Sequence, residues 1–291
     1  MSLEKVITCP VCQASEFNTH LICKDYTATG ELFHVEQCQA CGFLITTPRP
    51  TEENAGQYYQ SEAYISHTAK AAGPIDYIYL TVRHFTLNWK YRLISRKGTP
   101  AKLLDFGSGT GSFLNYCIDK GIDAYGIEPS IKARDTHAKV RDSLAALEIN
   151  DFNIITLWHV LEHVYTLEET LDKLKDLLAK TGTIFIAVPN WQSYDAQHYR
   201  AQWAAYDVPR HLWHFSQSTM KALLSKKGFK LQTIIPMKLD SYYVSLLSEK
   251  NTNGGTLPPM KMLRALRTAF ISNAKAKKDL NYSSLIYVAT K

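Results

Sequence analysis

Three glycines within five residues, directly after a short apolar run, constrain this chain more than any other feature of its sequence. The run ends in Asp105 and Phe106, and the glycines are Gly107, Gly109 and Gly111. Glycine tolerates positive φ and lets a ligand approach the backbone, so we expect a buried strand to turn sharply into a helix here. The third glycine comes one residue too early for a dinucleotide fingerprint, and no Gly-Lys-Ser/Thr of a P-loop follows.

Apolar segments alternate with amphipathic ones after this point. We expect helices after Gly111, after Ser130, at 167–179 and from Ser216 to Gly228. Between them we expect strands at 102–106, 124–128, 152–158, 183–188, 230–235 and 284–289. Such alternation indicates βαβ units, and therefore an α/β fold with a parallel sheet.

An acid follows the second expected strand. Glu128 comes about 20 residues after the first glycine, where a carboxylate can accept both hydroxyls of a ribose. With this acid the sequence resembles the class I S-adenosylmethionine-dependent methyltransferases, and the resemblance continues over residues 101–236. It implies a Rossmann-like methyltransferase sheet, mostly parallel with an antiparallel last strand.

The resemblance also implies how the cofactor is bound. Asp105 would orient the methionine amine, the glycine loop would shape the pocket, and Glu128 would hold the ribose. The end of the family's fourth strand, which corresponds here to Leu157, Trp158 and His159, would line the methionine half, and Asp142 and Ser143 would lie near the adenine. The full set is Asp105, Gly107, Ser108, Gly109, Thr110, Gly111, Glu128, Pro129, Asp142, Ser143, Leu157, Trp158 and His159.

Four of the six cysteines form two close pairs, Cys9 with Cys12 and Cys38 with Cys41. Two C-x-x-C turns can present four thiolates to one tetrahedral zinc ion, and such a closed site stabilises a fold rather than activating water. A metal-free pair of turns is the alternative, and an iron–sulfur cluster is disfavoured because no redox signal surrounds the pairs. Sugar methyltransferases of antibiotic and cell-surface pathways resemble this arrangement, although the larger ones carry a second C-terminal domain that this sequence lacks.

The predicted organisation has three parts. Residues 1–50 form a small zinc-ribbon-like knuckle module, residues 51–98 a connector with a packing helix at 74–97, and residues 99–291 the methyltransferase domain. Within the last part we expect a lid loop at 190–215 and a helical insertion at 240–282, with a basic amphipathic helix at 257–278.

Histidines concentrate in two segments. His211 follows the strand expected at 183–188 and is our first candidate for a general base, with Asp207 or Arg210 orienting it or the substrate. The alternative is that His211 and His214 anchor the helix that begins at Ser216. His163 is a secondary catalytic candidate.

Glu162 and His163 resemble a pair found in ubiquinone-type O-methyltransferases, some of which hold a divalent cation there. His159 replaces a further acid of those enzymes, so we do not expect a hard-cation site.

We predict methyl transfer to a small polar acceptor, with a sugar or sugar nucleotide as the first class considered. Tyrosines suit a sugar because they offer both a ring face and a hydroxyl. The predicted substrate contacts are Tyr58, Tyr59, Tyr64, Tyr206 and Arg210.

Two alternatives from other classes are a zinc-module protein that binds nucleic acid or protein, and a cofactor-binding protein without catalysis. The net charge of +6 is spread thinly, which disfavours nucleic acid. We expect a cytoplasmic protein with no membrane span, because the sequence has no long apolar run and no secretion signal. The acceptor atom and the oligomeric state stay open.

Overall fold

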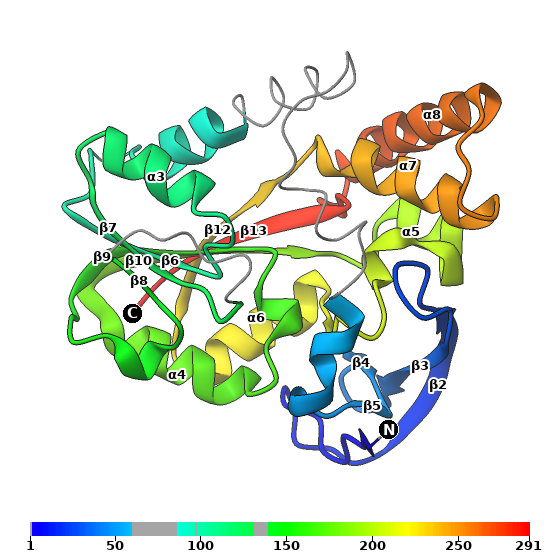
Figure 1. Cartoon of the computed structure of the whole chain (residues 1–291), viewed down its shortest axis with the longest axis horizontal. Coiled ribbons are helices and arrows are strands. Elements are labelled where there is room, and N and C mark those ends of the chain that lie inside the picture. The colour runs from blue at the N-terminus through cyan, green and yellow to red at the C-terminus, as the bar shows by residue number, and fades with distance from the viewer. Residues whose placement is uncertain (1, 60–85, 97, 131–138) are drawn as a thin grey trace.

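The computed structural model describes residues 2–59, 86–96, 98–130 and 139–291. Its centre is a seven-stranded sheet with the strand order β12-β13-β10-β9-β6-β7-β8 (Figure 1). Its pairs are parallel from β8 to β10, whereas β13 runs antiparallel to both β10 and β12. This confirms the predicted mostly parallel sheet with an antiparallel last strand. The strands are β6 (Lys102–Phe106), β7 (Asp123–Ile127), β8 (Val140–Arg141), β9 (Phe152–Trp158), β10 (Leu178–Pro189), β12 (Lys230–Pro236) and β13 (Ser284–Thr290).

Helices cover both faces of this sheet (Figure 1). On one face lie α4 (Leu167–Leu177) and α6 (Gln217–Lys226), and on the other lie α3 (Ser112–Asp119) and the helical residues 86–94. Apolar residues of α4 recur every three or four positions, which turns one stripe of the helix toward the sheet. These predicted helices are therefore present, whereas most of the helix expected after Ser130 and residues 74–85 of the packing helix lie outside the described residues.

Ser216 explains where α6 begins. Its hydroxyl accepts a hydrogen bond from the Thr219 amide, and the Thr219 hydroxyl accepts one from the Ser216 amide, which makes a capping box. The helix therefore starts where the sequence predicted.

Beyond β12 the chain forms an antiparallel helical pair. It consists of α7 (Asp240–Thr252) and α8 (Pro259–Ala276), which also packs on α5 (Tyr194–Tyr199). The sequence predicted α8 but did not separate α7 from it. The short 3-10 segments are η1 (Glu52–Tyr59), η3 (Leu144–Ala146), η4 (Leu161–His163), η5 (Arg200–Gln202) and η6 (Ala204–Tyr206).

The N-terminal residues build a smaller, four-stranded sheet in the order β11-β4-β3-β2. Its strands are β2 (Phe17–Lys24), β3 (Leu32–Cys38), β4 (Leu44–Thr46) and β11 (Trp213–His214), and β1 (Leu3–Glu4) pairs separately with β5 (Arg49–Pro50). Strand β11 comes from the segment predicted as a lid, so the end of the histidine-rich segment forms an edge strand of the N-terminal sheet.

The two sheets share one apolar cluster. It contains Cys9, Phe43 and Ile45 from the N-terminal part together with Leu104 and Leu157 of the large sheet. The boundary predicted near residue 50 falls between β5 and η1, and independent folding of residues 1–50 stays a prediction. None of the helices in the described part combines the length and the apolar character needed to cross a membrane.

Candidate functional site

The glycine loop lies at the carboxyl end of β6. Gly107, Gly109 and Gly111 all have positive φ, at 77°, 52° and 71°. A Cβ on Gly107 would lie 2.4 Å from Cγ2 of Val160, so a side chain there would displace the residues after β9. A Cβ on Gly109 would meet no atom of the described residues within 4 Å, so with respect to these residues this part of the loop faces open space. The loop therefore leaves room for a ligand against its backbone.

Glu128 lies beside that open space at the end of β7. Its carboxylate accepts hydrogen bonds from the amides of Gly109, at 2.8 Å, and Ser130, at 2.9 Å. A carboxylate has about four acceptor positions, so these bonds are compatible with ribose hydroxyls as further partners. The neighbouring Glu128 amide donates to the carbonyl of Arg141, which brings the exposed Asp142 and Ser143 to the same edge. Pro129 is also exposed there.

Asp105 is buried under the loop with 2% of its surface exposed. The Thr156 hydroxyl donates to it at 2.7 Å, and burial raises the pKa of its carboxyl to about 6. Trp158 Nε1 and Ser108 Oγ are buried without a hydrogen-bond partner in the described part of the chain. Polar groups left unpaired around an open loop suit a polar ligand. Leu157, by contrast, packs in the apolar core.

Lys90 was missed by the sequence analysis. Its ammonium lies 4.4 Å from the centre of the Trp158 ring, and burial lowers its pKa although Asp105 and Asp240 attract the charge. The signal was present, because Lys90 precedes the buried Leu93 and Ile94 by three and four residues and so shares their helix face.

His159 lies between two carboxylates just after β9. Its Nε2 is 2.9 Å from Asp240 at the start of α7, and its Nδ1 is 3.3 Å from the buried Glu162. Burial alone would lower the pKa of His159, but the two carboxylates raise it to about 10. His159 is therefore an imidazolium at neutral pH, and it joins α7 to the carboxyl edge of the large sheet.

His211 comes together with Glu162 and His163 although it lies far from them in the sequence. One ligand atom of each lies within 4.8 Å of the others, a spacing that could hold a metal ion. The donor set would be two nitrogens and one oxygen, unlike the all-oxygen set that hard cations prefer. Apart from the 3.3 Å ion pair with His159, neither Glu162 oxygen has a polar partner among the described residues. Burial and the charge of His211 lower the pKa of His163 to about 4.

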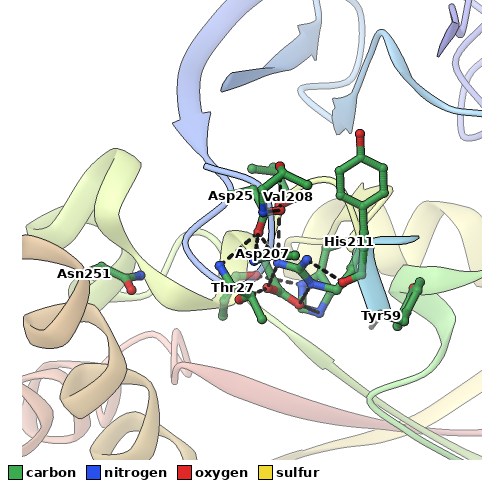
Figure 2. Close-up of polar contacts among 12 residues, drawn as sticks. Asp25, Thr27, Tyr59, Asp207, Val208, His211 and Asn251 are labelled. Atoms are coloured by element: carbon green, nitrogen blue, oxygen red, sulfur yellow. Dashed lines mark hydrogen bonds and ion pairs between the residues drawn. The ribbon is translucent and has the colours of Figure 1, made fainter. Parts of the chain in front are cut away.

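Backbone carbonyls fix the tautomers of these two histidines. Nδ1 of His211 lies 2.8 Å from the carbonyl of Ala205, and Nδ1 of His163 lies 3.0 Å from that of Arg210. A carbonyl only accepts, so each Nδ1 carries a proton and each neutral ring keeps a lone pair on Nε2. Nε2 of His211 is 4.0 Å from a carboxylate oxygen of Asp207. His211 lies near Asp207 in the cluster that Figure 2 shows.

A buried ion-pair network holds the segment that carries His211. Arg210 donates to Asp25 at 2.8 Å, to Asp207 at 2.7 Å and to the carbonyl of Tyr58 at 3.0 Å. Asp25 and Asp207 accordingly lie close together in Figure 2. The sequence analysis missed Asp25 and Thr27, which come from the turn between β2 and β3; the Thr27 hydroxyl donates to Asp207 at 3.4 Å. Arg210 thus ties the N-terminal sheet, η1 and the histidine segment together.

The predicted substrate tyrosines have different surroundings. Tyr59 brings its hydroxyl to 3.2 Å from Nδ1 of His163, whereas Tyr58 is buried and donates to Glu31 at 2.8 Å. Tyr206 is buried between the rings of Trp203 and His214. Tyr64 lies outside the described residues. Tyr58, Tyr59 and Arg210 line one small hollow with Pro50, Ala55, Tyr165 and Pro209.

A cavity of about 300 Å³ opens on the other side of His159. It was not predicted from the sequence, and Asp240 connects it to His159. Its walls are Thr86, Trp89, Ile235, Pro236, Met237, Lys238, Leu239 and Asp240. His159 therefore lies between this cavity and the Glu162–His163–His211 cluster.

The two cysteine pairs form matching turns. In each turn the amide of the residue four positions after the first cysteine, Gln13 or Gly42, donates to the carbonyl of Cys9 or Cys38. Both residues have positive φ, at 66° and 75°. The backbone amide of each first cysteine also donates a hydrogen bond to the carbonyl of the residue five positions later. Because both turns share this hydrogen-bonding pattern, the two cysteine pairs face the same position.

All four sulfurs lie within 4.8 Å of one another. Cys9 and Cys41 are 3.6 Å apart at sulfur, and Cys12 and Cys38 are 3.5 Å apart. A disulfide would require about 2.05 Å. Four thiolates around zinc at about 2.3 Å would lie about 3.8 Å apart, so the donor set and its spacing fit a tetrahedral ion.

Comparisons with known proteins found one family model and several similar solved structures. A family model described as a methyltransferase domain matches residues 83–234. A S-adenosylmethionine-dependent methyltransferase from Archaeoglobus fulgidus is similar at 19% identity and a TM-score of 0.48, over 79% of this chain and 100% of that one. The cyclopropane synthase MmaA2 from Mycobacterium tuberculosis is similar at 12% identity and a TM-score of 0.44, over 69% of this chain and 83% of that one.

A third similar structure is phosphoethanolamine N-methyltransferase 2 from Haemonchus contortus in complex with S-adenosyl-L-methionine. The identity is 15% and the TM-score 0.42, over 65% of this chain and 48% of that one, so the match spans about half of that enzyme's length. No curated protein sequence matches the chain. The family model covers more than half of the 291 residues, and the chain therefore belongs to the methyltransferase domain family.

Proposed function

We propose that this chain transfers the methyl group of S-adenosylmethionine to a small polar acceptor, with a sugar or sugar nucleotide as the first class to test. The observation that carries the proposal is the open glycine loop with the Glu128 carboxylate bonded to the Gly109 amide beside it. This arrangement gives a nucleoside a backbone surface and an acceptor for its ribose hydroxyls.

The residues present fit the cofactor. Glu128 would hold the ribose, Asp105 would pair with the methionine amine, and Lys90 would attract the methionine carboxylate. S-adenosylmethionine supplies an electrophilic methyl carbon on a sulfonium. The protein's own contribution is to hold the acceptor atom in line with that carbon at about 3–3.5 Å.

His211 is proposed as the base when the acceptor is a hydroxyl. Its Nδ1–H is fixed on the Ala205 carbonyl, so the lone pair on Nε2 is available for the acceptor's proton. The Asp207 carboxylate, 4.0 Å from that nitrogen, would stabilise the imidazolium that forms. His163 is a weaker base because its pKa lies near 4, and we propose that it positions the acceptor together with Tyr59.

The acceptor would bind around His159, between the His211 cluster and the cavity that Asp240 lines. Arg210 is occupied by Asp25 and Asp207, so in this proposal it fixes the histidine segment rather than binding the acceptor.

We also propose that Cys9, Cys12, Cys38 and Cys41 hold one structural zinc ion. The support is the spacing of their sulfurs and the two matching turns. With four protein ligands the ion would have no open position for substrate.

The test is a turnover assay with the purified protein, S-adenosylmethionine and a panel of sugars and sugar nucleotides. Formation of S-adenosylhomocysteine should require one acceptor and should fall strongly in His211→Gln. His198→Gln is the matched control, because His198 is exposed on α5. Cofactor binding without turnover on any of these acceptors would refute the acceptor class, and absence of cofactor binding would refute the function.

A further inference from the structure

Helix α8 differs from an ordinary surface helix in the side chains that it buries and exposes. Its side chains that face the protein are small, and its largest apolar side chains face outward. The buried residues are Ala265, Thr268, Ala269, Ser272 and Ala276, and the exposed ones are Met260 at 71%, Leu263 at 63%, Phe270 at 66%, Met262 at 48% and Leu266 at 41%. A surface helix normally directs its large apolar residues to the core and its polar residues to water.

The exposed apolar residues form one stripe. Met260, Leu263, Arg267 and Phe270 follow one another at intervals of three or four residues, which places them on the same helix face. An exposed stripe of this kind marks a surface that another apolar phase or partner covers.

The charges on and beside α8 indicate what covers its exposed stripe. Residues 254–278 contain no acid and six cations, which are Lys261, Arg264, Arg267, Lys275, Lys277 and Lys278. Lys261 and Arg264 lie 3.4 and 3.6 Å from Glu249, whereas Arg267 and the last two lysines are exposed. A second copy of this chain would bring like charges together along the stripe. The occupant must therefore combine an apolar phase with negative charge.

We propose that α8 binds the surface of an anionic lipid bilayer. The helix would lie in the plane of the interface, with Leu263 and Phe270 at the acyl boundary and its cations among the headgroups. This is an interfacial contact and not a span.

The position of α8 links this contact to the candidate site. Asn273 of α8 donates to the carbonyl of Lys238 at 2.9 Å, and Lys238 forms part of the wall of the 300 Å³ cavity. Leu239 of the same wall is 50% exposed. Binding at α8 would bring this wall close to the bilayer surface. The proposal does not depend on the identity of the methyl acceptor.

Vesicle co-sedimentation tests the proposal with the full chain. Vesicles of phosphatidylcholine with phosphatidylglycerol should bind the protein at least about tenfold better than pure phosphatidylcholine, and salt should weaken the binding. The double variant Leu263→Ser/Phe270→Ser should lose it, and Arg267→Glu should reduce it. Leu32→Ser is the matched control, because Leu32 is 67% exposed on β3.

The melting temperature and cofactor affinity of each variant should equal those of the parent, since these side chains point away from the core. Equal binding to both vesicle types, or no binding, would overturn the proposal. A dimer in solution that Phe270→Ser dissociates would also overturn it, because α8 would then be an interface between copies. Loss of vesicle binding in Leu32→Ser would show that the effect is not specific to α8.

Discussion

The glycine loop and the cysteine cluster are both built from turns with positive φ, yet they depend on their ligands in different ways. The loop between β6 and α3 is held by hydrogen bonds within the large sheet, including those of the Gly107 and Ser108 amides to the carbonyl of Ile127. The four cysteines bring their thiols within 4.8 Å of one another, and thiolates so close repel unless a cation lies between them. The loop is therefore held in place without its ligand, whereas the cluster would depend on the zinc ion that we propose.

The cysteine cluster is linked to the histidine segment, and not to the glycine loop, through β11. This strand pairs with β4 of the N-terminal sheet and continues from the segment that carries His211. The comparison therefore predicts that loss of zinc disturbs the histidine segment and spares the cofactor site.

Removing zinc should have the largest effect. Zinc binding to small zinc modules contributes about 10–16 kcal/mol to folding, so chelation or Cys38→Ser should loosen residues 1–50 and displace β11. Elemental analysis should show one zinc per chain before chelation. Turnover should be lost while cofactor affinity, measured by calorimetry, changes little.

Cys117→Ser is the control, because Cys117 is a buried cysteine of α3 outside the cluster. A parallel loss of cofactor affinity after chelation would show that the two regions form one unit.

Replacing His211 should have the next largest effect. His211→Gln removes the proposed proton acceptor, so turnover on a hydroxyl acceptor should fall about 10²–10⁴-fold. Cofactor affinity should stay the same, because the contacts of His211 are to Ala205, Asp207 and His163 and not to the glycine loop. Single-turnover kinetics with saturating cofactor give the measurement. A rate close to that of the parent would exclude His211 as the base.

Glu128→Gln should weaken cofactor binding by about 10–150-fold, the value of a charge-assisted hydrogen bond. The amide keeps the size of the side chain and removes its charge, so the bonds to Gly109 and to the ribose both weaken. Glu148→Gln is the control, since Glu148 is exposed beyond η3. Calorimetry that gives the same affinity for both variants would contradict the ribose assignment.

The smallest predicted effect is on the pH dependence of cofactor binding. Burial raises the pKa of Asp105 to about 6, and only the ionised carboxylate can pair with the cofactor's ammonium group. Affinity should therefore rise with pH up to about 6 and level off above it, changing by at most about tenfold per pH unit below that value. Asp105→Asn should abolish this pH dependence. A flat profile for the parent protein would place the ammonium elsewhere.

Local patterns account for what the sequence predicted correctly. The strands β6 and β9 coincide with the predicted 102–106 and 152–158, because apolar runs between turn signals specify buried parallel strands. Helix α7 lacked such a pattern. The buried residues on its face toward the protein include Ser241, Ser245 and Ser248, and from the sequence alone serines are expected on an exposed surface. The sequence therefore predicted a helical insertion at 240–282 without resolving α7 as a separate helix, although Asp240 belongs to the site.

The candidate site was predictable where its residues adjoin the strand ends. The glycine loop, Glu128 and the two cysteine pairs carry their own spacing signals. Asp25, by contrast, meets Arg210 across 185 residues, and no local rule relates these positions. The cavity likewise depends on how residues 86–94 pack beside the end of β12.

Strand β11 also sets an order of events during synthesis. Thr46 of β4 meets His214 of β11 across 168 residues, so the N-terminal sheet lacks its edge strand until most of the chain has left the ribosome. At about 5–20 residues per second this interval lasts on the order of ten seconds or more. Throughout it the cysteine turns and the open edge of β4 would be exposed to oxidants and to other nascent chains. A zinc ion captured early would protect the thiols and hold the first strands in register until the histidine segment arrives.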